Sequence, residues 1–222
     1  MIRAQQKPLV EIESLIGQAK NVLVLGCGTC TAVCLAGGEK EARTLAAALR
    51  VSAQIKGVQR EVRHSLVQRQ CEPEFVREVE EEVLWADVIV SLACGIGCQV
   101  MNERYPERLT VPGVNTCFLG APIEHGVFDE RCQACGDCIL HLTGGICPIA
   151  RCAKSMLNGP CGGSQHGKCE VNPSNPCAWQ LIYERLLSLN KLELISAILP
   201  AKDWRSARDG GQRRIVREDV RL

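Results

Sequence analysis

The sequence predicts an α/β protein in which a small doubly wound (Rossmann-like) parallel-sheet domain precedes a cysteine-rich loop module. Two apolar runs, "NVLVLGCG" from Asn21 and "DVIVSLACG" up to Gly95, have the continuous hydrophobicity of strands buried on both faces, and each ends at a glycine. Beyond residue 123 the composition changes to glycine, cysteine and proline. The whole chain has 15 cysteines among 222 residues, far more than an ordinary soluble protein.

The first domain is predicted to cover residues 1–122, where strands and helices alternate. A short amphipathic segment comes first, with apolar residues at Leu9, Ile12, Leu15 and Ile16. One helix is expected up to Arg50 and another from Glu74, because Ala42, Leu45, Ala46 and Leu49, and then Phe75, Val79 and Val83, recur at helical spacing. A weaker strand is expected within residues 55–68, a helix after Gly95, and a last strand in "RLTVPGVNT", which Pro112 interrupts.

The rest of the chain is divided into a module of residues 123–178 and a C-terminal part of residues 179–222. The module has little periodicity and is too rich in loops to bury a core of its own, so we expect it to form around inorganic centres. "AWQLIYERLLSLN" predicts a closing amphipathic helix. Residues 201–222 carry seven Lys or Arg against four Asp or Glu, which is typical of a solvated tail, with docking onto a partner as the alternative.

Charge and composition exclude several classes of function. A net charge of +1 and an aromatic content of 4% argue against nucleic-acid binding. The apolar runs are shorter than the roughly 20 residues of a membrane span. "MIRAQQKPLVEIESLI" lacks the apolar core and cleavage site of a secretory signal, so we expect a reducing, cytoplasmic location. Clustered cysteines in that setting are more often metal ligands than disulfides.

The module's first cysteines have the spacing of a cluster-binding loop. Cys132, Cys135 and Cys138 follow a C-x2-C-x2-C pattern, and Cys147 precedes a proline. Ferredoxin-like loops with this pattern hold three corners of a [4Fe–4S] cluster, whereas zinc sites more often use two separated C-x2-C pairs. The sequence therefore favours iron–sulfur clusters over zinc in this module.

The number of cysteines indicates two clusters. Eight lie from residue 132 onward, as many as two four-thiolate cubanes require: Cys132, Cys135, Cys138, Cys147, Cys152, Cys161, Cys169 and Cys177. In ferredoxins the cysteine before proline serves the other cluster, so Cys147 is grouped with Cys152 and later cysteines, and one later cysteine completes the first site. Free buried thiols remain an alternative for one or two of the eight, Cys177 above all.

A second group of thiols lies in the first domain. The metal-ligand candidates there are Cys27, Cys30, Cys34, Cys94 and Cys98, which follow the two strongest strands. The carboxyl edge of a doubly wound sheet is where such folds bind ligands. A third [4Fe–4S] cluster and a zinc ion both fit thiolate ligation, and we favour the cluster, with Cys71 and Cys117 as further candidates. The third glycine of a dinucleotide fingerprint is missing after Gly26 and Gly28, so NAD binding is not expected.

The stretch "CGDCILHLTGGICPIARCAKSMLNGPCGGSQHGKCEVNPSNPCAWQLIYERL" resembles the domain named after the C-terminal region of methylenetetrahydrofolate reductases. The blocks "TGGICP", "NGPCGG" and "GKCE" are its specific features. Together with "VLGCGTCTAVCLAGGEKEA" and "ADVIVSLACGIGCQ", residues 20–190 are similar to the small iron–sulfur subunits that accompany this reductase in acetogens and related anaerobes.

By this resemblance the chain would bind the flavin-containing (MetF-like) catalytic subunit, whose TIM barrel reduces methylene-tetrahydrofolate in the methyl branch of the Wood–Ljungdahl pathway. It would deliver electrons to that flavin without catalysis of its own. Heterodisulfide-reductase-like or NADH-oxidising subunits would be the electron donors. The alternatives are a zinc-stabilised scaffold that orders the reductase without carrying electrons, and a zinc–thiolate site that activates a methyl acceptor.

Overall fold

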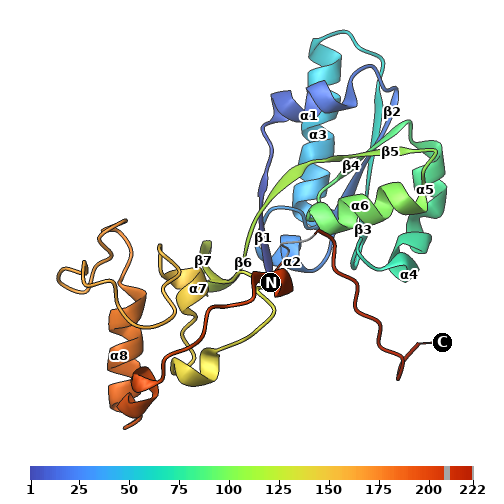
Figure 1. Ribbon diagram of the computed structural model, residues 1–222. Coiled ribbons are helices and arrows are strands. Elements are labelled where there is room, and N and C mark those ends of the chain that lie inside the picture. The colour runs from blue at the N-terminus through green and yellow to red at the C-terminus, as the bar shows by residue number, and fades with distance from the viewer. Residues whose placement is uncertain (208–210, 222) are drawn as a thin grey trace. The chain divides into compact units, whose positions relative to one another are not determined.

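The computed structural model describes residues 1–207 and 211–221 of the chain. It forms two compact units, residues 1–129 and residues 130–222 (Figure 1). The first unit is a mixed α/β structure around a parallel sheet, as the sequence predicts. The second consists mainly of loops with short helices.

The parallel sheet has four strands in the order β3-β2-β4-β5. Their bounds are β2 (Asn21–Cys27), β3 (Glu61–Val67), β4 (Val88–Ser91) and β5 (Leu109–Pro112). All three pairings are parallel, which confirms the doubly wound prediction. Pro112 ends β5, which is an edge strand, and a proline is tolerated there because fewer ladder hydrogen bonds are needed.

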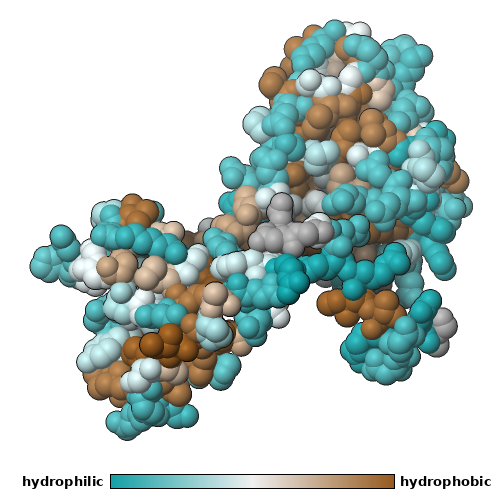
Figure 2. All heavy atoms as spheres, viewed as in Figure 1, coloured by the Kyte–Doolittle hydropathy of each residue, from teal (hydrophilic) through white to brown (hydrophobic). Residues whose placement is uncertain are grey.

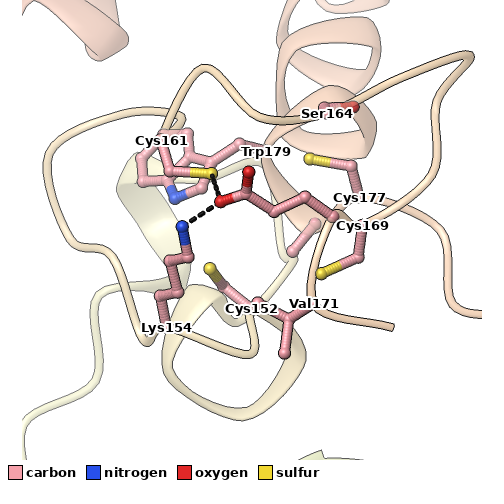
Figure 3. A pocket seen from close by; sticks show the side chains of 10 residues that line it. Cys152, Lys154, Cys161, Ser164, Cys169, Val171, Cys177 and Trp179 are labelled. Carbon is pink, nitrogen blue, oxygen red and sulfur yellow. Dashed lines mark hydrogen bonds and ion pairs between the residues drawn. The ribbon is translucent and has the colours of Figure 1, made fainter. Parts of the chain in front are cut away.

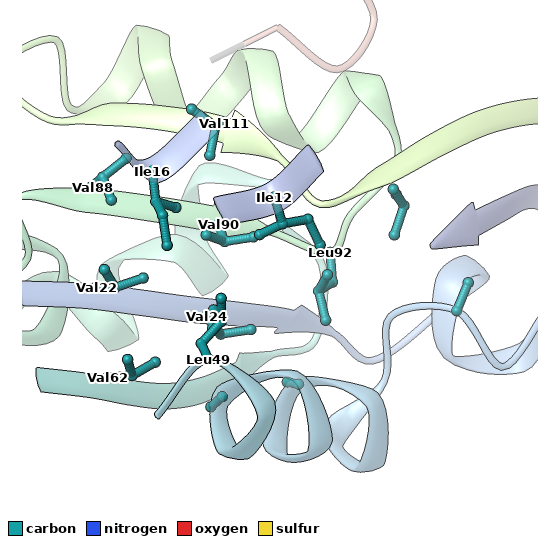
Figure 4. Packing of buried hydrophobic residues seen from close by; sticks show 14 of the residues in the cluster. Ile12, Ile16, Val22, Val24, Leu49, Val62, Val88, Val90, Leu92 and Val111 are labelled. Carbon is teal, nitrogen blue, oxygen red and sulfur yellow. The ribbon is translucent and has the colours of Figure 1, made fainter. Parts of the chain in front are cut away.

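Helices cover both faces of this sheet. Val22 and Val24 of β2 face α1 (Leu9–Ile16) and α3 (Glu39–Ile55), in the core shown in Figure 4. Their neighbours Leu23 and Leu25 face the opposite way, into a core that includes Met101 of α6 (Gly95–Arg104). Alternate residues of one strand are thus buried on both sides, which explains the unbroken apolar runs in the sequence.

The sequence predicts one continuous helix from Glu74. This prediction is wrong, because the structure breaks the segment into shorter helices. The segment forms α4 (Pro73–Val76), a 3-10 turn at Arg77–Val79, and α5 (Glu80–Trp85). Val79 leaves helical geometry with φ −115° and ψ 21°. Three glutamates follow it, and negative charge favours a new helix N-terminus. Val79 and Val83 are nevertheless buried in the core, as their apolar spacing predicts.

A second sheet was not predicted. It has three strands in the order β1-β6-β7: β1 (Ile2–Gln6), β6 (Val114–Glu124) and β7 (Val127–Cys132). β1 and β6 are antiparallel, and Met1 and Gly120, 119 positions apart, exchange two backbone hydrogen bonds of 3.0 Å. Gly126 turns the β6–β7 hairpin with φ +80°, a conformation that glycine adopts without strain.

The second unit has a small core beside α8 (Ala178–Ser188), which confirms the predicted closing helix. Trp179, Ile182 and Leu186 of α8 are buried and pack against Ile146 and Met156, among others. The other short elements are 3-10 turns at Leu140–Leu142, Leu192–Ser196 and Trp204–Ser206, and α7 (Pro148–Arg151). Of the predicted basic tail, residues 208–210 and 222 lie outside the described residues.

In the part of the chain that is described, no helix is long and apolar enough to cross a membrane. The 17-residue α3 carries Glu, Lys and Arg side chains along its length. Figure 2 shows hydrophilic residues over much of the visible surface, with hydrophobic residues between them.

Candidate metal-binding site

Four cysteines line one pocket in the second unit: Cys152, Cys161, Cys169 and Cys177 (Figure 3). Cys152 directly follows α7, and Cys177 is the N-cap residue of α8. The other two come from the loop between these helices. The cavity measures about 20 Å³, which is room for about one water molecule.

Backbone hydrogen bonds hold the loop that carries these thiols. The Cys169 N–H donates to the Asn175 carbonyl at 3.1 Å, and the Cys177 N–H donates to the Gly167 carbonyl at 2.7 Å. Gly167 has φ +76°, a conformation that a residue with a side chain resists. Two of the four thiols are therefore fixed by the fold of the loop itself, although it contains little regular secondary structure.

An ion pair lies among the four thiols. The Glu170 carboxylate accepts a hydrogen bond from the Lys154 ammonium and another, of 3.4 Å, from the Cys161 thiol (Figure 3). Lys154 lowers the pKa of Glu170, and the same hydrogen bond raises the pKa of Lys154. The ion pair thus lies among the lining residues of the four-cysteine pocket.

Backbone amides influence the thiol of Cys169. The N–H groups of Asn172 and Val171 lower the pKa of this thiol. On the protein side of the pocket, Trp179 is 6% exposed, and its indole N–H donates to the Met156 carbonyl at 3.0 Å. The pocket therefore combines amide donors for anionic sulfur with a fixed apolar wall.

The C-x2-C-x2-C cysteines form a separate loop of the same unit. Cys132 ends β7, and its sulfur accepts a hydrogen bond of 3.3 Å from the Ala134 N–H. Cys135 and Cys138 follow without joining the pocket of Figure 3, and Cys147, the N-cap of α7, is not among its lining residues either. The structure thus groups Cys152 with the three later cysteines, while Cys147 stands outside that pocket.

Part of the predicted tail packs on this loop, so the expectation of a fully solvated tail is wrong for these residues. The Ser206 hydroxyl donates to the Cys135 carbonyl at 2.8 Å. The Lys202 ammonium donates to the Asp137 carbonyl at 3.4 Å, and the Lys202 side chain is only 6% exposed. The charge composition of the tail could not predict these contacts, because they involve backbone carbonyl groups of the loop.

All 15 cysteines lie within the described residues, and each is a free thiol there. Among the same residues, no three or more His, Cys, Asp or Glu side chains are arranged to hold a metal ion as they stand. The donor set of the four-cysteine pocket nevertheless fits a group that binds thiolates alone. The cavity of about 20 Å³ is smaller than a cluster, and the partly exposed Glu170 and Lys154 side chains are among its lining residues.

The structure also places the cysteines of the first unit. Cys27 ends β2, Cys30 begins the short helix α2 (Cys30–Val33), and Cys94 is the N-cap of α6, so all three lie at the carboxyl edge of the sheet, as predicted. Cys34 and Cys98 are buried. Cys117 is exposed on β6, where its sulfur accepts a 3.0 Å hydrogen bond from Arg3.

Comparison with known proteins gives one match. Residues 111–205 match the model of a family described as "Methylene-tetrahydrofolate reductase C terminal". No curated protein and no solved structure matches the chain. The matched segment contains all eight cysteines from residue 132 onward, including the four of the pocket. The match supports the family resemblance seen in the sequence and links this segment to methylene-tetrahydrofolate reductase.

Proposed function

We propose that this chain is an iron–sulfur electron-transfer subunit of a methylenetetrahydrofolate reductase, of the MetV type, acting in the cytoplasm. The observation that carries the proposal is the pocket lined by four cysteines within the segment that matches the reductase family. A single lone thiol is readily explained by packing, but four thiols around one cavity are the donor set of a four-thiolate centre.

Two [4Fe–4S] clusters are assigned to the second unit. Cys152, Cys161, Cys169 and Cys177 would hold one cluster, because they line the same pocket. The other would be held by Cys132, Cys135 and Cys138, with Cys147 as the remaining thiol of the eight. This grouping differs from the ferredoxin pattern, in which the cysteine before proline belongs with the later ones.

Neighbouring residues of the chain have roles that follow from their contacts. A cluster, when bound, accepts and releases single electrons. Lys202 supplies positive charge beside the loop of Cys135 and Cys138, and such charge raises a cluster's reduction potential. The amide donors at Cys169 stabilise its thiolate form. Trp179 excludes water from one side of the pocket.

The proposed partner is the flavin-containing (MetF-like) catalytic subunit, because a flavin collects two electrons for hydride-type chemistry while clusters pass them singly. Heterodisulfide-reductase-like or NADH-oxidising subunits are the proposed donors.

Anaerobic stopped-flow spectroscopy tests this function. The full chain is reduced with dithionite, freed of excess reductant and mixed with a purified flavin-containing methylenetetrahydrofolate reductase. We expect the flavin absorbance to bleach while the visible absorption of oxidised clusters returns. The Cys161→Ser chain should transfer fewer electrons, and the Cys117→Ser chain should behave as the wild type. A stable complex in which no electron moves would contradict the proposal and support a scaffold.

A further inference from the structure

The segment that follows α8 packs on other parts of the second unit. It begins with the 3-10 turn at Leu192–Ser196, whose apolar residues pack against the buried face of α8. It then continues to a second 3-10 turn, at Trp204–Ser206. Residues 199–206, which we call the strap, contact two different segments that carry cysteines, one at each end of the strap.

The first end of the strap is anchored beside the four-cysteine pocket. The Asn158 amide nitrogen donates to the Leu199 carbonyl at 2.9 Å, and the Leu199 N–H donates back to the Asn158 amide oxygen at 2.7 Å. Asn158 lies three positions before Cys161, a lining residue of that pocket. Asn158 and Leu199 also line a small cavity together with Trp179, which borders the four-cysteine pocket as well. The strap is therefore tied to the segment between α7 and α8.

The other end of the strap is anchored on the C-x2-C-x2-C loop. The Ser206 hydroxyl donates to the Cys135 carbonyl at 2.8 Å. The Lys202 ammonium donates to the Asp137 carbonyl at 3.4 Å and lies 4.0 Å from the Asp137 carboxylate. The Lys202 side chain is only 6% exposed, and burial of a charged group is costly unless it is hydrogen-bonded and paired. The contacts to the loop thus hold Lys202 in its buried position.

Gly136 of this loop leaves room for the strap. A Cβ at Gly136 would lie 2.4 Å from the Ser206 carbonyl oxygen, so a larger residue there would displace the strap. Gly162 is a matched comparison, because it directly follows Cys161 as Gly136 directly follows Cys135. The two glycines have φ +86° and +81°, but a Cβ at Gly162 would meet nothing within 4 Å. Alanine at either position is strained, and only at Gly136 does it also meet the strap.

We propose that residues 199–206 couple the C-x2-C-x2-C loop to the segment that carries the four-cysteine pocket, so that the two groups of thiols keep a fixed arrangement. One of these segments precedes α7 and the other follows it, and the strap contacts both. Asn158, Gly136 and Ser206 are positioning residues. The coupling itself needs no metal, whereas its consequence, a fixed path for electrons between two clusters, rests on the proposed function.

Limited proteolysis with trypsin tests the coupling, because the strap contains a buried cleavage site at Lys202. The full-length chain is digested under native conditions, and cleavage after Lys202 is followed by mass spectrometry. Cleavage after Arg217 is the internal reference, since that side chain is 67% exposed and an acidic residue follows it, as one follows Lys202. In the wild type we expect slower cleavage after Lys202 than after Arg217, because only an open strap can be cut there.

Variants at the two anchors should open the strap. Asn158→Ala removes both hydrogen bonds to Leu199, and Gly136→Ala displaces Ser206. We expect each to speed cleavage after Lys202 about five-fold relative to Arg217, the factor that corresponds to the loss of one net hydrogen bond. Gly162→Ala is the matched control and should be cleaved like the wild type.

Three results would overturn the proposal: equal cleavage after Lys202 and Arg217 in the wild type, unchanged cleavage in both anchor variants, or the same acceleration in Gly162→Ala. Circular dichroism checks that each variant is folded. Asn158→Asp, which keeps the acceptor for the Leu199 N–H, and Ser206→Ala are the milder substitutions if an anchor variant is not. Trypsin cleavage does not depend on iron, so a chain without clusters would contradict the proposed function and still test the strap.

Discussion

Replacing Cys169 by serine is expected to remove about four irons and their sulfides from each chain, because one of the four ligands of a cubane is lost. Cys169 is a proposed ligand of this cluster, and backbone N–H groups lower the pKa of its thiol. The same groups would be left facing a neutral hydroxyl in the variant. The measurement is iron and sulfide per chain, with EPR of the dithionite-reduced protein.

Double substitutions test which cysteines share a cluster. If Cys161 and Cys169 bind the same cluster, the Cys161→Ser/Cys169→Ser chain loses no more iron than either single variant. The Cys135→Ser/Cys169→Ser chain should lose about eight irons, because its two ligands belong to different clusters. Cys117→Ser is the matched control, since Cys117 is exposed and lies in the other unit. Additive losses for Cys161 and Cys169 would contradict the grouping.

Replacing Gln70 by methionine is expected to destabilise the first unit by about 2–3 kcal/mol. Methionine has nearly the same length, so little cavity forms, but the Ser91 hydroxyl loses its acceptor and the Gly26 carbonyl loses the amide that donates to it. Burial of an unpaired polar group costs about 1–3 kcal/mol. Native-state hydrogen exchange of the β2 and β4 amides measures the effect within this unit alone.

Gln68→Met is the matched control for this substitution. Gln68 lies two positions earlier in the same loop with an exposed side chain, so the same chemical change should cost at most about 0.5 kcal/mol. If the β2 and β4 amides of the Gln70→Met chain exchange as slowly as those of the wild type, the Gln70 side chain does not stabilise the loop.

The parallel sheet could be predicted because its signals are local. Val22 to Leu25 and Val88 to Val90 are buried on both faces, so each strand is a short apolar run. The second sheet could not be predicted in this way, since β1 pairs with a strand more than a hundred residues later. "IRAQQ" has neither strong alternation nor a nearby turn, and only the tertiary partner makes it a strand.

The sequence identifies the candidate cysteines, but it does not show which of them lie together. Spacing identifies Cys132, Cys135 and Cys138, because three ligands in one loop have a fixed pattern. It does not group the later cysteines, since their positions depend on loops whose shape is set by backbone hydrogen bonds such as Cys177 to Gly167. The position of Cys71 could be predicted in one respect. It follows a predicted parallel strand, and loops after parallel strands lie at the same edge of the sheet as Cys27 and Cys94.

The most direct measurement is the iron, acid-labile sulfide and zinc content of the anaerobically purified chain, together with EPR before and after dithionite. The two clusters proposed for the second unit predict about eight irons per chain, equal sulfide, and cubane signals that appear on reduction. About twelve irons would keep the electron-transfer proposal and add a third cluster. Zinc with negligible iron would contradict the central claim and make these cysteines structural.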